Sequence, residues 1–172
     1  EGLSGRKQYI DVTVCVPMTG LRLSRDTWKV KRGDEKTLKV TVLPENTTDS
    51  YKWSSSDGTV VQVDQEGNVK AVGNGTADII VTSSRGKTAS CTFTVYTNAE
   101  KVTFKQASYD VFLGDTIELM ADIEPEDITE SVVYTSSDEK ILKQISEGTW
   151  KAVSPGTAVV SVKTSDTQIE AS

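Results

Sequence analysis

Histidine is absent from the 172 residues of this chain. Its absence removes the usual general base near neutral pH, the base of a Ser-His-Asp triad and the commonest zinc ligand. There are only two cysteines, Cys15 and Cys91, which are too few and too far apart for a zinc knuckle or a CxxC redox pair. The composition therefore excludes much enzyme chemistry. We expect a protein that is not an enzyme, with no catalytic residue, bound metal or cofactor.

Long apolar runs are also missing. Hydrophobic residues make up 36% of the chain and are spread evenly along it. No stretch approaches the roughly 18 apolar residues that suggest a membrane-spanning helix. We expect a soluble protein with small packed cores and no membrane insertion.

Basic residues are in the minority. The chain has 19 of them and 25 acidic residues, so its net charge is −6. A phosphate backbone requires a clustered basic surface, so this charge argues against nucleic-acid binding. Acidic side chains can hold calcium, but the sequence contains no loop of the D-x-[DN]-x-[DN]-G type. We interpret the acidic residues as a solvated surface.

The two cysteines do not suggest a disulfide bond. Cys91 has the same parity as Phe93 and Val95 and should point into a core, whereas Cys15 has the opposite parity to Val12 and Val14. Two cysteines are too few to indicate the redox compartment.

An internal repeat organises the chain. Gly33 corresponds to Gly114, 81 positions further on, and this offset holds without a gap. The matching segments include Pro44-Glu45 with Pro125-Glu126, Ser55-Ser56-Asp57 with Ser136-Ser137-Asp138, and Gly75-Thr76-Ala77 with Gly156-Thr157-Ala158. Two copies of one module therefore follow each other.

Within each copy the apolar residues recur with a period of two. Leu38 to Val42 alternates in this way, as does Ile117 to Ala121 in the second copy. This period places apolar side chains on one face of a strand. Turn-forming residues separate such runs, and no segment has the pattern of a long amphipathic helix. Short strands broken by turns, in a unit of about 80 residues, predict an all-β chain of two antiparallel β-sandwich domains.

Three segments also resemble a known family. They are the run from Gly33 to Pro44, the segment Trp53-Ser54-Ser55-Ser56-Asp57, and the run from Gly67 to Ala77. Together they resemble the bacterial immunoglobulin-like (Ig-like) group 2 domains, over nearly the whole chain. The resemblance implies two tandem Ig-like sandwiches. In that family such modules occur in strings on surface adhesins, as accessory units of extracellular enzymes and in phage structural proteins.

The repeat register predicts the domain boundaries. Residues 17–97 form the first Ig-like domain, and residues 98–172 form a second that lacks a counterpart of the last strand, since Ser172 aligns with Cys91. Residues 1–16 are either a linker or an orphan last strand of a preceding repeat, because Gln8 to Val14 aligns with Ala89 to Val95.

The orphan strand leaves two alternatives open. In the first, the segment stays with the first module or remains unpaired. In the second, it is donated to the second module of a neighbouring chain, which would be a strand-swapped self-association. Filling the gap within one chain looks hard, because about nine residues extend only about 30 Å.

Aromatic residues occupy repeat-equivalent positions. Trp53 and Tyr134 should fill the cores, Trp28 and Tyr109 should also serve packing, and Trp150 should fill the second core. The alternative is a sugar-binding surface, which needs a coplanar pair of exposed rings. The candidates for that pair are Tyr9, Trp28, Tyr51, Tyr109 and Trp150.

Asp57 and Asp138 follow serines and should accept hydrogen bonds from backbone amides in turns. A glycosidase would need a carboxylate pair in a cleft, which a small sandwich with short loops rarely makes. We also interpret the glycosylation-like sequences at Asn46 and Asn74 as turns.

The sequence therefore favours a spacer or cell-adhesion segment of a larger bacterial protein, extracellular or on the cell surface. Its expected partners are the neighbouring Ig-like repeats of the parent chain, together with surface protein or glycan ligands. The alternatives are a carbohydrate-binding or accessory module of an extracellular enzyme, and a structural domain of a phage virion.

Overall fold

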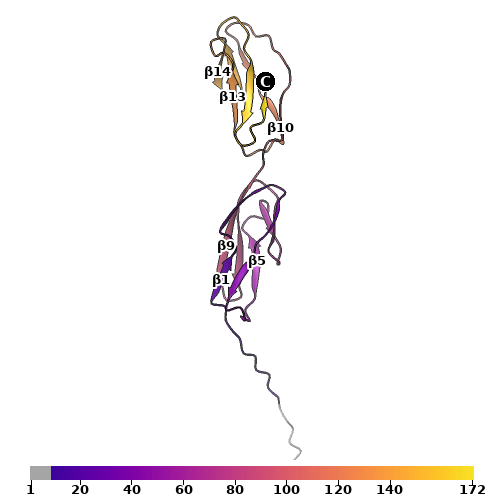
Figure 1. The fold of residues 1–172 in the computed structure, drawn as a ribbon, viewed down its shortest axis with the longest axis vertical. Helices are drawn as coiled ribbons and strands as arrows, with labels where there is room; N and C mark the ends of the chain where they lie inside the picture. Colours follow the sequence, from indigo (N-terminus) through magenta and orange to yellow (C-terminus); the bar gives the residue numbers. More distant parts are fainter. Residues whose placement is uncertain (1–8) are drawn as a thin grey trace, which may run out of the picture. The chain divides into compact units, whose positions relative to one another are not determined.

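The computed structural model describes residues 9–172, and all regular secondary structure in that range is β-strand. The chain divides into two compact units, one made mostly of residues up to Phe93 and the other mostly of residues from Thr94 onward. Figure 1 shows the strands of the first in indigo to magenta and those of the second in orange to yellow. None of the described residues forms a helix that could cross a membrane. The predicted all-β fold with two tandem sandwiches is confirmed.

We call residues 17–97 the first module and residues 98–172 the second, and these boundaries stay predictions from the repeat. The first module has three sheets, with strand orders β2-β9-β8-β5, β3-β7-β6 and β1-β4. Its strands are β1 (Gly20–Leu23), β2 (Thr27–Lys31), β3 (Glu35–Thr37), β4 (Val40–Leu43), β5 (Tyr51–Ser55), β6 (Val61–Val63), β7 (Asn68–Ala71), β8 (Gly75–Ser83) and β9 (Thr88–Tyr96).

The second module repeats this plan, with strand orders β13-β16-β17, β11-β15-β14 and β10-β12. Each strand of the first module has a counterpart except β2, whose equivalent residues 108–112 form no strand. The strands are β10 (Lys101–Phe104), β11 (Thr116–Glu118), β12 (Ala121–Glu124), β13 (Val132–Ser136), β14 (Leu142–Ser146), β15 (Thr149–Ala152), β16 (Val160–Thr164) and β17 (Glu170–Ala171).

The period of two predicted one strand from Leu38 to Val42, but only Val40 to Val42 lies in a strand, and Leu38 and Lys39 join β3 to β4. β3 pairs with β7, whereas β4 pairs with β1 in a different sheet. Leu38 lies between β3 and β4, where the chain passes from one sheet to the other. Its amide donates a hydrogen bond to the carbonyl of Gly67, and its side chain is buried. The alternation continues across the change of sheet because both strands keep the same parity toward the core. In the second module, the run from Ile117 to Ala121 includes the end of β11 and the first residue of β12, which lie in different sheets.

The core of the first module closes around Trp53, which is 5% exposed. Gly67, in the turn between β6 and β7, approaches it so closely that an added Cβ would lie 2.9 Å from the indole ring and 2.6 Å from the carbonyl oxygen of Leu38. Its φ of +86° is also unfavourable for other residues. Gly67 is therefore required by both the backbone and the packing, and the predicted core role of Trp53 is confirmed.

The second core is built around Trp150 and Tyr134, which are 0% and 5% exposed. The phenol oxygen of Tyr134 accepts a hydrogen bond of 3.1 Å from the amide of Ala121. The other buried members of this cluster are Ala99, Val102, Leu119 and Val162. Trp150 replaces the smaller Val69 of the first copy, so the two cores differ in how they are filled while the strand plan is the same.

Replacing Trp53 with alanine should lower the free energy of unfolding of the first module by about 3 to 5 kcal/mol, the usual range for emptying a large aromatic site in a core. Trp28→Ala should cost less, since that ring is only half-buried. Native-state amide exchange of β8 in the whole chain measures both losses. A loss at Trp53 below about 1 kcal/mol, as for a surface substitution, would contradict the core assignment.

Candidate functional site

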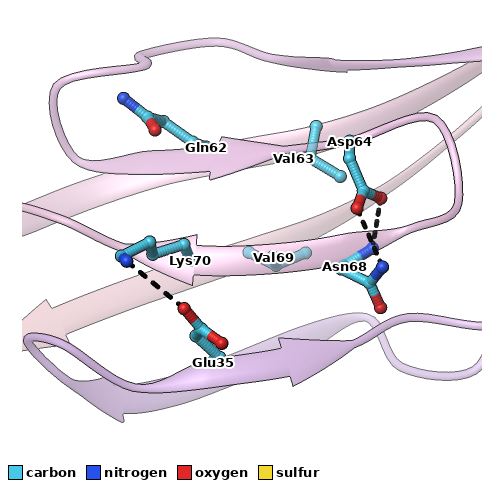
Figure 2. A pocket seen from close by; sticks show the side chains of 7 residues that line it. All are labelled: Glu35, Gln62, Val63, Asp64, Asn68, Val69 and Lys70. Carbon is cyan, nitrogen blue, oxygen red and sulfur yellow. Dashed lines mark hydrogen bonds and ion pairs between the residues drawn. The ribbon is translucent and has the colours of Figure 1, made fainter.

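A shallow depression lies on the sheet β3-β7-β6 of the first module (Figure 2). It has a volume of about 460 Å³ and lies over the buried side chain of Val69. The polar residues that line it are Glu35, Gln62, Asp64, Asn68 and Lys70. These side chains come from neighbouring strands and the turns that join them.

Asp64 and Asn68 fasten the turn between β6 and β7. The Asp64 carboxylate accepts hydrogen bonds of 2.8 Å from the side-chain amide and from the backbone amide of Asn68, and one of 3.0 Å from the backbone amide of Glu66. The side-chain bond from Asn68 and these backbone bonds hold the pKa of Asp64 below its ordinary value. Asp64 therefore stays ionised and is occupied as a structural acceptor.

Glu35 and Lys70 form an ion pair of 3.3 Å across β3 and β7 (Figure 2). Both side chains are more than half exposed, and such surface pairs contribute about 0 to 1 kcal/mol. The depression thus holds two carboxylates that already have partners. It does not hold a nucleophile beside a base, and covalent catalysis requires that arrangement. Across residues 9–172 no group of three or more histidines, cysteines or carboxylates could hold a metal ion.

The structure confirms the predicted turn roles of Asp57 and Asp138. The Asp57 carboxylate accepts bonds of 2.6 Å from the hydroxyl and 2.8 Å from the amide of Thr59, and these lower its pKa. The Asp138 carboxylate accepts a bond of 2.8 Å from the amide of Lys140. Both carboxylates serve the same structural role in the two copies.

The aromatic side chains do not form a sugar-binding platform in the described part of the chain. Trp150 is wholly buried, so the alternative of sugar stacking is wrong for this residue. Trp28 packs on Phe93 with ring centroids 5.7 Å apart, and the guanidinium of Arg25 lies 4.6 Å from its ring centre. The three exposed tyrosines, which are Tyr9, Tyr51 and Tyr109, have no ring partner among the described residues.

The cysteines lie as the parity predicted. Cys91 is 0% exposed and Cys15 is exposed, and both are free thiols. Burial raises the pKa of Cys91, which makes it an unreactive core residue.

With this geometry established, comparison with known proteins gives the family. Residues 17–93 match the bacterial Ig-like domain (group 2). This part of the chain belongs to that family. The second module lies outside this match and has the same strand plan as the first, apart from β2.

Three relatives cover different shares of the chain. An uncharacterised protein of Clostridium acetobutylicum is 29% identical over 95% of this chain, which is 17% of that protein. The lacto-N-biosidase of Bifidobacterium bifidum is 36% identical over 55% of this chain and 9% of its own length. A minor capsid protein of enterobacteria phage T3 is 44% identical over 42% of this chain and 17% of its own length. This chain spans less than a fifth of each relative.

Two solved structures align with parts of this chain. Domains 4 and 5 of the S-layer protein SbsC align over 90% of this chain and 96% of that chain, with a TM-score of 0.37 and 17% identity. A mutant of intimin from EHEC O157:H7 aligns over 51% of this chain and 54% of that chain, with a TM-score of 0.37 and 19% identity.

Each Ig-like module also contains a buried carboxylate clasp, which we define as a carboxylate that joins the first segment of the module to a hairpin. In the first module, Asp49 accepts a bond of 2.7 Å from the amide of Met18 and pairs at 2.9 Å with the guanidinium of Arg85, in the β8–β9 hairpin. The bond from the Met18 amide and the bond from Arg85 lower the pKa of Asp49.

The clasp of the second module uses Glu130, which aligns with Asp49 and is 8% exposed. Its carboxylate accepts bonds of 2.6 Å from the amide of Ala99, and of 2.8 and 3.0 Å from the amides of Asp166 and Thr167 in the β16–β17 hairpin. Burial alone would raise the pKa of Glu130, but the backbone bonds from Thr167, Ala99 and Asp166 outweigh it and lower the pKa. The sequence analysis missed both residues, although the repeat register places acidic residues at the same position.

Acid should destabilise the second module through Glu130. A carboxyl whose pKa is lowered by folding stabilises the native state above its ordinary pKa of 4.5, and that contribution is lost as the pH falls through the lowered value. Glu130→Gln should cost about 1 to 3 kcal/mol at neutral pH, because the new NH₂ group faces amide donors. It should also flatten the loss of stability in acid.

Amide exchange of β16 between pH 3 and pH 7 measures this effect, and Glu126→Gln at an exposed position of the same module is the control. Equal acid sensitivity in both variants would show that Glu130 is not the group responsible.

Proposed function

We propose that this chain is a non-catalytic structural or adhesive segment of a larger bacterial extracellular or cell-surface protein, where it serves as a spacer or cell-adhesion module. The main support is the use of its carboxylates. Asp57 and Asp138 close equivalent turns, and Asp49 and Glu130 form equivalent clasps. Acidic groups that are occupied by backbone amides in both copies are not free to act on a substrate.

Membership of the Ig-like family supports the same proposal, because such a module supplies a stable β-sandwich without needing a site of its own. The proposed partners are neighbouring Ig-like repeats of the parent chain and protein ligands on a surface, whereas glycan ligands belong to the second candidate below. Relatives in two bacteria, each more than five times as long as the matched segment, support a place within a long bacterial chain.

A second candidate is an accessory or carbohydrate-binding module of an extracellular enzyme. The 36% identity with a lacto-N-biosidase favours it. The aromatic side chains oppose sugar binding, because stacking on a sugar uses exposed rings and the described exposed tyrosines are isolated.

A glycan array probed with the labelled chain separates the two candidates. We expect no saturable signal, because no described pair of exposed rings offers a stacking surface. Tyr51→Ala and Tyr109→Ala are the matched variants, one in each module. A saturable glycan signal that either substitution removes would overturn the spacer proposal and favour a carbohydrate-binding module.

Display of the chain on a bacterium that does not adhere to host cells then separates the two roles within the proposal. Adhesion gained by the displaying cells indicates an adhesive segment. An accessible terminal epitope without adhesion indicates a spacer.

A further inference from the structure

One edge of the first module is closed by a side chain. β5 is the last strand of the sheet β2-β9-β8-β5, so one side of it has no neighbouring strand. Alternate residues of such a strand direct their backbone amide and carbonyl away from the sheet, and the register with β8 places Trp53 among them. The side-chain amide of Gln65 accepts a bond of 3.2 Å from the amide of Trp53 and donates one of 3.2 Å to its carbonyl. We call this pair of bonds the edge brace, because it takes the place of a neighbouring strand.

The equivalent edge of the second module has no edge brace. β13 is the last strand of the sheet β13-β16-β17, and its residue Tyr134 corresponds to Trp53. The bond from the amide of Ser165 to the carbonyl of Ser131 fixes the same alternation, so the amide and carbonyl of Tyr134 also point away from the sheet. Gln65 corresponds to Ser146, which has no side-chain amide. No described residue bonds to these two backbone groups of Tyr134.

The open edge belongs to β13 itself. β17 forms the opposite edge of the same sheet, so the opening at β13 does not depend on how that other edge is completed. A charge that guards the first module is also missing, because Val133 replaces Lys52 of β5. Lysine on an edge strand is one of the features that discourage pairing with another chain. The β13 edge thus lacks both protections of the β5 edge.

An open hollow of about 510 Å³ lies along this edge, between β13 and β14, which are both labelled in Figure 1. Its apolar wall includes Val133 and Ile145, which are 55% and 53% exposed. The backbone of an added strand could therefore pair with β13 while its side chains cover apolar surface.

The rim of the hollow is acidic. Glu139 and Glu147 line it, both are exposed, and no basic side chain is among its described lining residues. Neither carboxylate forms an ion pair with another described residue. A segment with lysine or arginine side chains complements this rim, whereas a second copy of a chain with net charge −6 is opposed by repulsion.

We propose that the β13 edge binds an extended segment of a partner protein that alternates apolar and basic side chains. The amide and carbonyl of Tyr134 pair with the backbone of the segment, as in other cases of strand addition. Val133 and Ile145 contact its apolar side chains, and the acidic rim contacts its basic ones. This inference rests on the proposed adhesive role and names the class of ligand for it.

A labelled peptide with the sequence of residues 27–32, Thr-Trp-Lys-Val-Lys-Arg, is the probe. It alternates apolar and basic residues, and its first five residues form strand β2 in this protein. Fluorescence anisotropy should show saturable binding to the whole chain, and NMR shifts should locate it at the amide of Tyr134. The same peptide with proline in place of its valine keeps the charge but cannot pair fully as a strand. It should bind much more weakly.

Transplanting the edge brace tests the site. Ser146→Gln changes no charge and should weaken peptide binding by roughly tenfold or more, because the new amide competes for both backbone groups of Tyr134. Ser154→Gln, at an exposed position outside the hollow, is the matched control and should bind as the parent chain does. The reciprocal double variant Lys52→Val with Gln65→Ser should open the β5 edge and add a second site, with shifts at the amide of Trp53.

Three results would overturn the proposal. They are the absence of peptide binding, binding that Ser146→Gln leaves unchanged, and equal binding of the proline peptide, which would indicate charge attraction alone. Light scattering tests the other occupant. Self-association of the chain that Ser146→Gln abolishes would assign the edge to a second copy and overturn the partner segment.

Cells that display the chain separate this inference from the proposed function. Equal adhesion by the parent chain and Ser146→Gln would support the adhesive role and overturn the β13 edge as its site. Peptide binding that Ser146→Gln removes, in a chain that confers no adhesion, would support the edge as a binding site and contradict the adhesive role.

Discussion

Each module depends on one constraint, which is that the side chains of its facing sheets interdigitate in one thin core. Such a core is only about 10 Å thick, so an inward-facing residue is covered by the opposite sheet or is not covered at all. Trp53 reaches across to the turn at Gly67 in this way. Each strand is thus a part of the core that no other strand replaces.

The polar residues are arranged around the same constraint. A thin core leaves the strand ends and hairpins near its rim, where their backbone amides need acceptors. Asp64, Asp57 and Glu130 supply these acceptors with short bonds. This accounts for lowered pKa values in a protein with no catalytic constellation among its described residues, since a carboxylate that accepts several backbone bonds is held in its ionised form.

Much of this fold could be predicted from the sequence because the pattern occurs twice. The repeat offset of 81 residues, together with the period of two, was enough to predict the sandwich fold, the buried aromatic residues and the aspartates in the turns. The change of sheet at Leu38 could not be seen, because the parity toward the core is unbroken there. The clasps of Asp49 and Glu130 depend on contacts between residues far apart in the sequence. A one-dimensional pattern does not carry such contacts, although the repeated acidic position was a signal for the clasps.

Trp150 has a consequence for observing the protein. Its indole nitrogen is buried and has no hydrogen-bond partner among the described residues, and the ring packs among the apolar side chains of the second core. Of the chain's three tryptophans, the other two, Trp28 and Trp53, lie in the first module. With those two replaced by phenylalanine, the fluorescence of Trp150 becomes a spectroscopic label of the second module alone. Blue-shifted emission from it would report, without any added dye, that water has not entered that core.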